Sequence, residues 1–395
     1  MAHLFSWLIL GSLFVALTLP LPSNPQQGEV TFSNFQEQIN FGSQITFQVK
    51  VTTQDTINQV FLFLEIDQVN ILPVTATINK RGEITGSYDA NQGFLQPFDR
   101  IEYYYKVILK DGRTLESPHH QFEYRDTRFD WQQLSDNHFE VFWYSGGLQF
   151  GQELLGVSQD SLASIRRITN RTPSSPVRIY VYETAADLQK ALQLTHNTWI
   201  AGHANPAGNL ILVSISPGTE QRVEMERQLP HELMHIVQFQ MAGEESSRLP
   251  TWLVEGMASI VELYPNPDYQ YVLDNAVQSR SLLSLSSLCS SFPRDAAGAF
   301  LAYAESASFM RYIFQNYGQI GISKLIAQYK NGLGCEEGSS AALGQPLSKL
   351  ETSWQQESLG INTGALVFEK LLPYLFLLAL IALPPAVVVF FLLKK

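Results

Sequence analysis

The stretch Pro230-His231-Glu232-Leu233-Met234-His235 predicts the fold and the chemistry of the second half of this chain. Histidines four residues apart on a helix project from the same face, one turn apart. Neutral imidazoles in this arrangement can hold one divalent ion, and Zn²⁺ is the usual occupant of such a pair. Glu232 would lie beside the open position of that metal, where it can take a proton from a metal-bound water.

The helix that carries this stretch is expected to be buried. Apolar residues flank its histidines, namely Leu229, Leu233, Met234, Ile236, Val237 and Phe239. Such a pattern is typical of a helix that packs against a core, whereas the alternative is a surface helix with solvated side chains. Because unpaired polar groups are costly to bury, the histidines need partners, and a metal ion supplies one.

A third metal ligand is expected further along the chain, because zinc is poorly held by two protein ligands. Glu255 lies 20 residues after His235, within Trp252-Leu253-Val254-Glu255-Gly256-Met257-Ala258. That separation leaves room for a turn and the start of a facing helix. We therefore predict one Zn²⁺ per chain, held by His231, His235 and Glu255.

These two stretches carry a resemblance to a known family. His231 to His235, followed by Trp252 to Ser259, resembles the gluzincin metallopeptidases. In particular it is similar to the HExxH and Trp-Leu-x-Glu-Gly-x-Ala-Ser blocks of the aminopeptidase N family and to bacterial peptidase MA-like proteins. The resemblance covers about residues 175 to 330. It implies that His231, His235 and Glu255 are zinc ligands and that Glu232 is the general base.

The resemblance also implies where a substrate would lie. In gluzincins the strand ahead of the HExxH helix is at the sheet edge and pairs with the substrate backbone. Leu210 to Ser214 is the apolar strand expected in that place, after a turn-rich segment from Thr198 to Asn209. The aminopeptidase N family carries a glutamate near here that captures the free amine. The comparable segment, Gly202 to Pro206, has no acidic residue, which favours an endopeptidase. His203 within it is interpreted as structural or solvated, the alternative being a contact with the substrate or the metal.

A tyrosine in a later helical run is a second catalytic candidate. Tyr303, with Ser306 three positions on, matches an aminopeptidase N segment whose tyrosine donates a hydrogen bond to the oxyanion. A neutral phenol aimed at a developing negative charge would complement a Lewis-acid metal. The alternative is a tyrosine packed in the helical core.

The composition limits the number of domains and the kinds of partner that the chain can have. The chain has 395 residues, of which 45% are hydrophobic and 16% charged, enough for two globular domains. Its net charge of −11 disfavours a nucleic-acid partner, and we find no basic patch with interleaved aromatic residues.

The first part of the chain is expected to be all-β. Residues 28–124 show short alternating runs, such as Ile45 to Val51, punctuated by turns such as Lys110-Asp111-Gly112-Arg113. The pattern predicts an immunoglobulin- or fibronectin-like sandwich without a catalytic cluster, either a spacer or a module for a protein or glycan ligand. Residues 130–360 then form the α+β gluzincin zinc-peptidase domain.

The two ends of the chain are apolar. Residues 1–22 are interpreted as a signal peptide or an uncleaved signal anchor. Residues 371–393 precede Lys394-Lys395 and predict a transmembrane helix with a cytoplasmic C-terminus, the alternative being a buried hairpin of a soluble core. Cys289 and Cys335 are expected to form a disulfide in an oxidising compartment, unless they are two buried free thiols.

Together these features predict a multidomain, single-pass cell-membrane protein with its catalytic domain on the extracytoplasmic side. Its predicted activity is that of a zinc metallopeptidase, acting on a peptide or protein substrate, with endopeptidase action favoured. One alternative is a non-catalytic surface binding or adhesion protein that uses the peptidase fold as a scaffold. Another is hydrolysis of a non-peptide amide by the same residues.

Overall fold

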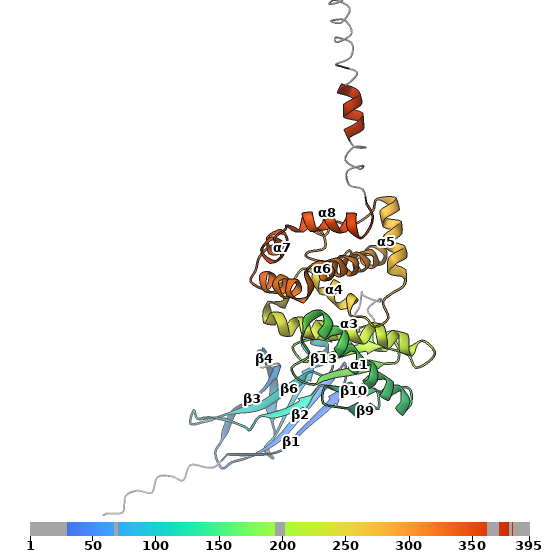
Figure 1. Ribbon diagram of the computed structural model, residues 1–395. Helices are drawn as coiled ribbons and strands as arrows, with labels where there is room; N and C mark the ends of the chain where they lie inside the picture. Colours follow the sequence, from blue (N-terminus) through green and yellow to red (C-terminus); the bar gives the residue numbers. More distant parts are fainter. Residues whose placement is uncertain (1–29, 67–69, 194–201, 362–370, 379–380, 382–395) are drawn as a thin grey trace, which may run out of the picture. The chain divides into compact units, whose positions relative to one another are not determined.

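The computed structural model describes residues 30–66, 70–193, 202–361, 371–378 and 381 (Figure 1). The chain divides into two compact units. The strand unit comprises Met1–Ile39, Gln44–Asp89 and Ile101–Phe122, and the α/β unit comprises Asn40–Ser43, Ala90–Arg100 and Glu123–Lys395. The predicted signal segment, residues 1–22, lies outside the described residues.

The strand unit confirms the predicted β-rich N-terminal region. Its strands are β1 (Thr31–Asn40), β2 (Gln44–Thr52), β3 (Ile57–Ile66), β4 (Asn70–Ile78), β5 (Glu83–Asp89), β6 (Arg100–Leu109), β7 (Thr114–Glu116) and β8 (His120–Glu123). The alternation predicted for β2 is present, with Ile45, Phe47, Val49 and Val51 buried. The described strands are all hydrogen-bonded into one sheet, in the order β1-β2-β5-β4-β3-β6-β7 with β8 on β6. β4 pairs with β3 over Asn70–Thr75 and with β5 over Ala76–Ile78, so it joins two sets of strands, and Phe47 of β2 packs on Tyr103 of β6 with ring centroids 5.0 Å apart.

The α/β unit contains a second sheet. Its strands are β9 (Gln132–Ser135), β10 (Phe139–Trp143), β11 (Val177–Tyr182), β12 (Gly202–Asn205) and β13 (Leu210–Ser214), in the order β12-β13-β11-β10-β9. β13 pairs with β11 on one side and with β12 on the other. The prediction that Leu210 to Ser214 forms the sheet edge is therefore wrong, because both of its hydrogen-bonding sides are occupied. Among the described strands, β12 lies at that edge.

Helices make up most of the α/β unit (Figure 1). In chain order they are η1 (Ala90–Gln92), α1 (Leu148–Thr169), α2 (Ala185–Ala191), α3 (Gln221–Ala242), η2 (Gly243–Arg248), α4 (Thr251–Ile260), α5 (Asp268–Ser279), α6 (Ala296–Lys330), α7 (Cys335–Leu343) and α8 (Leu347–Glu357). The motif helix α3 is buried on its apolar side, as the sequence predicts, with Leu229, Leu233, Met234 and Ile236 at 1% exposure or less.

Helix α4 approaches α6 closely. A Cβ added at Gly256 of α4 would lie only 2.6 Å from the carbonyl oxygen of Ser306 in α6, so a larger residue would force the two helices apart. Trp252, at the start of α4, packs edge-to-face on Phe309 of α6 with ring centroids 5.0 Å apart. These contacts fix the helix that carries Glu255.

The start of α4 is also held by the segment before α6. The backbone N–H groups of Thr251 and Trp252 donate to the carbonyl oxygens of Cys289 and Leu288, each at 3.1 Å. Cys289 forms the predicted disulfide with Cys335, at the first residue of α7. The disulfide thus links the cap of α4 to the last helices of the unit.

The predicted transmembrane helix over residues 371–393 is corrected by the structure. No helix in the described part of the chain is both long and apolar enough to cross a membrane. Residues 371–378 are helical, and apart from residue 381 the rest of the stretch lies outside the described residues. The membrane anchoring that depended on this helix is corrected with it.

One ionisable residue lies in the helical core away from the histidines. Glu305 of α6 is fully buried, and its Oε1 accepts a hydrogen bond from the Leu283 N–H at 2.9 Å. Its Oε2 has no hydrogen-bond partner among the described residues. Burial, reinforced by the charge of Glu351, raises the pKa of Glu305 to about 8. The folded chain therefore favours the protonated carboxyl.

This burial predicts a pH-dependent stability. Between the ordinary glutamate pKa and about 8, the folded chain holds a proton on Glu305 that the unfolded chain releases, so stability falls as pH rises. The slope contributed by one group is at most about 1.4 kcal/mol per pH unit. We expect Glu305→Gln to remove this part of the slope in urea unfolding between about pH 5 and pH 8. The exposed Glu244→Gln is the matched control, and an unchanged slope in Glu305→Gln would contradict the assignment.

Candidate metal centre

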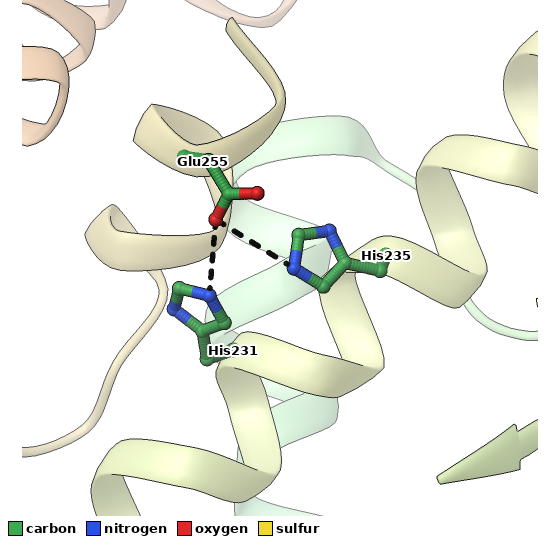
Figure 2. A group of neighbouring side chains, drawn as sticks. All are labelled: His231, His235 and Glu255. Atoms are coloured by element: carbon green, nitrogen blue, oxygen red, sulfur yellow. Dashed lines mark ion pairs between the residues drawn. The ribbon is translucent and has the colours of Figure 1, made fainter. Parts of the chain in front are cut away.

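The two motif histidines lie one turn apart on α3, and Glu255 faces them from α4 (Figure 2). The ring centroids of His231 and His235 are 5.1 Å apart. Glu255 Oε2 lies 3.4 Å from His231 Nε2 and 3.9 Å from His235 Nε2. The structure therefore brings all three predicted ligands together, with their ligand atoms within 4.8 Å of one another.

The outer nitrogens of both imidazoles are bonded to other side chains. His231 Nδ1 lies 3.1 Å from Glu262 Oε1, and His235 Nδ1 lies 3.1 Å from Gln238 Oε1. Since Gln238 donates its own N–H to the carbonyl of Val254 at 2.8 Å, its amide oxygen is left to accept from His235. Protonation at Nδ1 leaves the Nε2 lone pairs directed toward Glu255. Two Nε2 atoms and one carboxylate oxygen, with the outer nitrogens bonded, form a donor set that fits zinc.

The pKa values within the cluster show how strongly its members interact. Burial lowers the pKa of His231, but hydrogen bonds with Glu255 and Glu262 outweigh it and raise the pKa to about 10. Burial raises the pKa of Glu255, whereas the nearby His235 and His231 lower it, and the net shift is downward. The cluster thus favours positive charge beside an ionised Glu255. A divalent cation bound here would displace that imidazole proton.

Glu262 is a functional residue that the sequence analysis missed. Its side chain is 3% exposed, and its Oε2 has no partner among the described residues. It follows the end of α4, where the chain turns back onto α3 through hydrogen bonds from the Leu263 and Tyr264 N–H groups to the Glu226 carbonyl. No local repeat in the sequence indicated it, because Glu262 lies beyond the last residue of α4.

Glu232, the predicted base, lies against the edge strand β12. A Cβ added at Gly202 would clash with the Glu232 carboxyl group and lie 2.9 Å from its Cδ, so only glycine leaves the carboxyl group in its present place. The neighbouring His203 pairs with Leu212 in the sheet. Burial lowers the pKa of His203, against an opposing effect of the Glu232 charge, so its imidazole is held neutral.

Tyr303 of α6 reaches the same site. Its ring centroid lies 6.3 Å from that of His231, and its hydroxyl is close enough to the Glu255 carboxylate for each group to shift the pKa of the other. Burial, together with the charges of Glu255 and Glu232, raises the pKa of Tyr303. The phenol is therefore neutral, and its proton is available as a hydrogen bond.

These residues surround one cavity of about 600 Å³. It is lined by Gly202, His203, Ala204, Pro206, Arg227, Gln228, His231, Glu232, His235, Gln238, Phe239, Ser246, Ser247, Leu249, Val254, Glu255, Glu262, Tyr269 and Tyr303. All five predicted site residues lie on its wall: His231, Glu232, His235, Glu255 and Tyr303. A cavity of this size can accept several residues of an extended peptide.

Comparisons with solved structures give distant likenesses. An M1 zinc metallopeptidase from Deinococcus radiodurans is 12% identical, with 84% of this chain and 95% of that chain covered and a TM-score of 0.39. An aminopeptidase N family protein from Idiomarina loihiensis is 9% identical, with 86% and 75% covered and a TM-score of 0.34. At these TM-scores we base no argument on the likeness. No curated protein matches the chain.

One protein-family profile matches the chain. The profile of the peptidase MA superfamily matches residues 157–359, more than half of the 395 residues. The matched region includes all five predicted site residues, and the match confirms the resemblance to peptidase MA-like proteins that the motifs indicated. This chain belongs to the peptidase MA superfamily.

Proposed function

We propose that this protein is a zinc-dependent peptidase that cleaves peptide bonds by attack of water, with Glu232 as general base. The observation that carries the proposal is the convergence of His231 Nε2, His235 Nε2 and Glu255 Oε2 on the wall of one cavity. Membership of the peptidase MA superfamily supports the same class of reaction. A bound Zn²⁺ would supply Lewis-acid polarisation of the scissile carbonyl and would acidify water.

Glu232 would transfer a proton from the attacking water to the leaving amine. Its carboxylate lies on the cavity wall beside Gly202, and Glu232 directly follows His231 in the chain. It would accept a proton from the attacking water and then pass that proton to the leaving amine. The neutral His203 would not compete for this proton, because its pKa is lowered.

Tyr303 would stabilise the oxyanion. Its hydroxyl is neutral and lies near the Glu255 carboxylate on the wall of the same cavity. A small change in its orientation would direct its proton to an oxygen that gains negative charge in the transition state. Glu255 of α4 and Tyr303 of α6 would thus both act at the scissile carbonyl, the first through the metal and the second through its hydroxyl.

The substrate backbone would lie along β12. Gly202, His203 and Ala204 of this strand line the cavity, and β12 is at the edge of the described sheet. An exposed edge can hydrogen-bond to an extended peptide. No acidic residue occurs from Gly202 to Pro206, so this segment offers no carboxylate for a substrate amine, which favours an endopeptidase. The Cys289–Cys335 disulfide supports an oxidising, extracytoplasmic compartment.

Metal content tests the ligand set. We expect purified wild-type protein to contain about one zinc per chain by atomic emission, and both His235→Ala and Glu255→Ala to lose most of it. Gln240→Ala, at the end of α3 outside the cavity, is the matched control and should keep the metal. Zinc retained at full occupancy in both ligand variants, with the fold intact by circular dichroism, would contradict the site.

A conservative change of the base tests the mechanism. Glu232→Gln keeps the size of the side chain but cannot accept the proton, so peptide cleavage should fall by at least about a hundredfold. Its zinc content should equal that of the wild type, because Glu232 is not in the ligand set. Cleavage of casein by the wild type and by this variant at equal rates would rule out Glu232 as the base and favour a scaffold role for the fold.

Gly202→Ala tests the placement of the base without changing a polar group. The added methyl would displace the Glu232 carboxyl group from its contact with β12. We expect kcat to fall by about tenfold or more, since a misplacement of about 1 Å can cost that much. Zinc content and the unfolding midpoint should change little. The control is Gly208→Ala, where the added Cβ meets only ordinary contacts at 3.5 Å or beyond.

A further inference from the structure

The cavity wall contains one residue that the proposed mechanism does not use. Arg227 lies on α3 four residues before His231, so it shares the helix face of His231 and His235 and lies one turn closer to the start of the helix. It lines the same cavity. Among the described lining residues it is the only lysine or arginine, whereas three lining residues are glutamates: Glu232, Glu255 and Glu262.

The guanidinium of Arg227 is held in place, but not all of its N–H groups have a hydrogen-bond acceptor among the described residues. Its Nη1 donates to Glu224 Oε1 at 3.2 Å, and that carboxylate is 38% exposed. Its Cζ lies 5.8 Å from the centroid of the Tyr264 ring. Its Nε is buried and has no hydrogen-bond partner among the described residues. A buried N–H without an acceptor is costly, and no hydrogen bond from Nη2 is found in the described part of the chain either.

Two further unsatisfied atoms lie on neighbouring side chains of this end of the cavity. Gln228 Oε1 and Glu262 Oε2 are also buried without partners among the described residues. Arg227, Gln228 and Glu262 all line the cavity, and Tyr269 beside them is close enough for Arg227 to influence its pKa. Both of these oxygens are acceptors, so of the three unpartnered atoms only the N–H of Arg227 has the character that pairs with a ligand oxygen.

We propose that Arg227 binds a carboxylate of the peptide substrate and so makes this site selective for substrates with a negative charge next to the cleaved bond. This inference rests on the proposed peptidase function. Arginine presents parallel N–H groups that match the two oxygens of a carboxylate, and such bonds are among the strongest in proteins. The partner Glu224 uses one nitrogen and is partly exposed, which leaves the other edge of the guanidinium for the ligand.

A carboxylate is favoured over a cationic group at this end of the cavity. A lysine or arginine of the substrate would be repelled by Arg227 at short range, and the carboxylates of Glu255 and Glu262 would be engaged by the bound metal and by His231. The carboxylate could come from an aspartate or glutamate side chain or from the C-terminus of the peptide. Both have the same chemistry.

The first test is binding, which does not require turnover. Zinc-loaded Glu232→Gln protein is immobilised and offered a mixed library of short synthetic peptides, and retained peptides are identified by mass spectrometry. We expect the retained peptides to be enriched in Asp and Glu, or in free over amidated C-termini, and these two results separate the sources of the carboxylate. Adding Arg227→Gln should abolish the enrichment. Equal retention of acidic and neutral peptides would overturn the proposal.

The second test is kinetic and uses a peptide pair that differs only in this carboxylate and its amide. Wild-type protein should prefer the carboxylate by about tenfold in kcat/KM, and Arg227→Gln should lose the preference through KM rather than kcat. Arg227→Lys keeps the charge but not the paired N–H groups, so it should retain part of the preference. An unchanged preference in Arg227→Gln would overturn the proposal.

Glu224→Gln is the matched control. If Arg227 served only as the partner of Glu224, Arg227→Gln and Glu224→Gln would lower the stability of the protein equally. Neither would then change the preference for a substrate carboxylate. We expect Glu224→Gln to keep or increase the preference for the carboxylate, because it removes a competing acceptor. If the wild type cleaves no peptide, the proposed function fails. The retention experiment still decides whether Arg227 binds carboxylates.

Discussion

The packing of α4 between α3 and α6 is the constraint on which the site depends. Glu255 can meet both histidines only if α4 approaches α3 at its start, and the adjacent Gly256 allows α6 to lie directly behind. Trp252 fills the space on the same side by packing against Phe309. A glycine directly after the ligand is therefore a packing requirement. The backbone of α6 occupies the volume where a side chain would be.

This packing buries charge, and the structure compensates for it locally. His231, His235 and Glu255 are each less than one-fifth exposed. Isolated ions at such depth would be expensive, so each has a polar partner. Glu262 bonds to His231, Gln238 bonds to His235, and Tyr303 lies near Glu255. The outer partners set the tautomer of the imidazoles and also reduce the cost of burying them.

The sequence revealed the parts of the site that depend on local periodicity. His231 and His235 could be placed on one helix face because the helical repeat alone determines it, and Glu255 could be placed on the next helix from its spacing. Glu262 could not, because its contact requires the chain after α4 to fold back onto α3. The edge strand was misplaced for a related reason. Gly202 to Asn205 has no apolar alternation, so β12 read as a turn, and its strand character comes from pairing with β13.

The charges on the cavity wall give Arg227 a second role beside ligand binding. Glu232, Glu255 and Glu262 bring three carboxylates to one cavity, and the raised pKa of His231 means that its imidazole holds a compensating proton there. A divalent cation would replace that proton, and Arg227, one turn along α3, is the one lysine or arginine among the described lining residues, although its guanidinium already pairs with Glu224. Burial of like charges is tolerated only near such compensation. The same arginine that would attract a substrate carboxylate thus also lowers the cost of assembling the acidic site. For this reason its effect on substrate selectivity must be separated from its effect on the folded state.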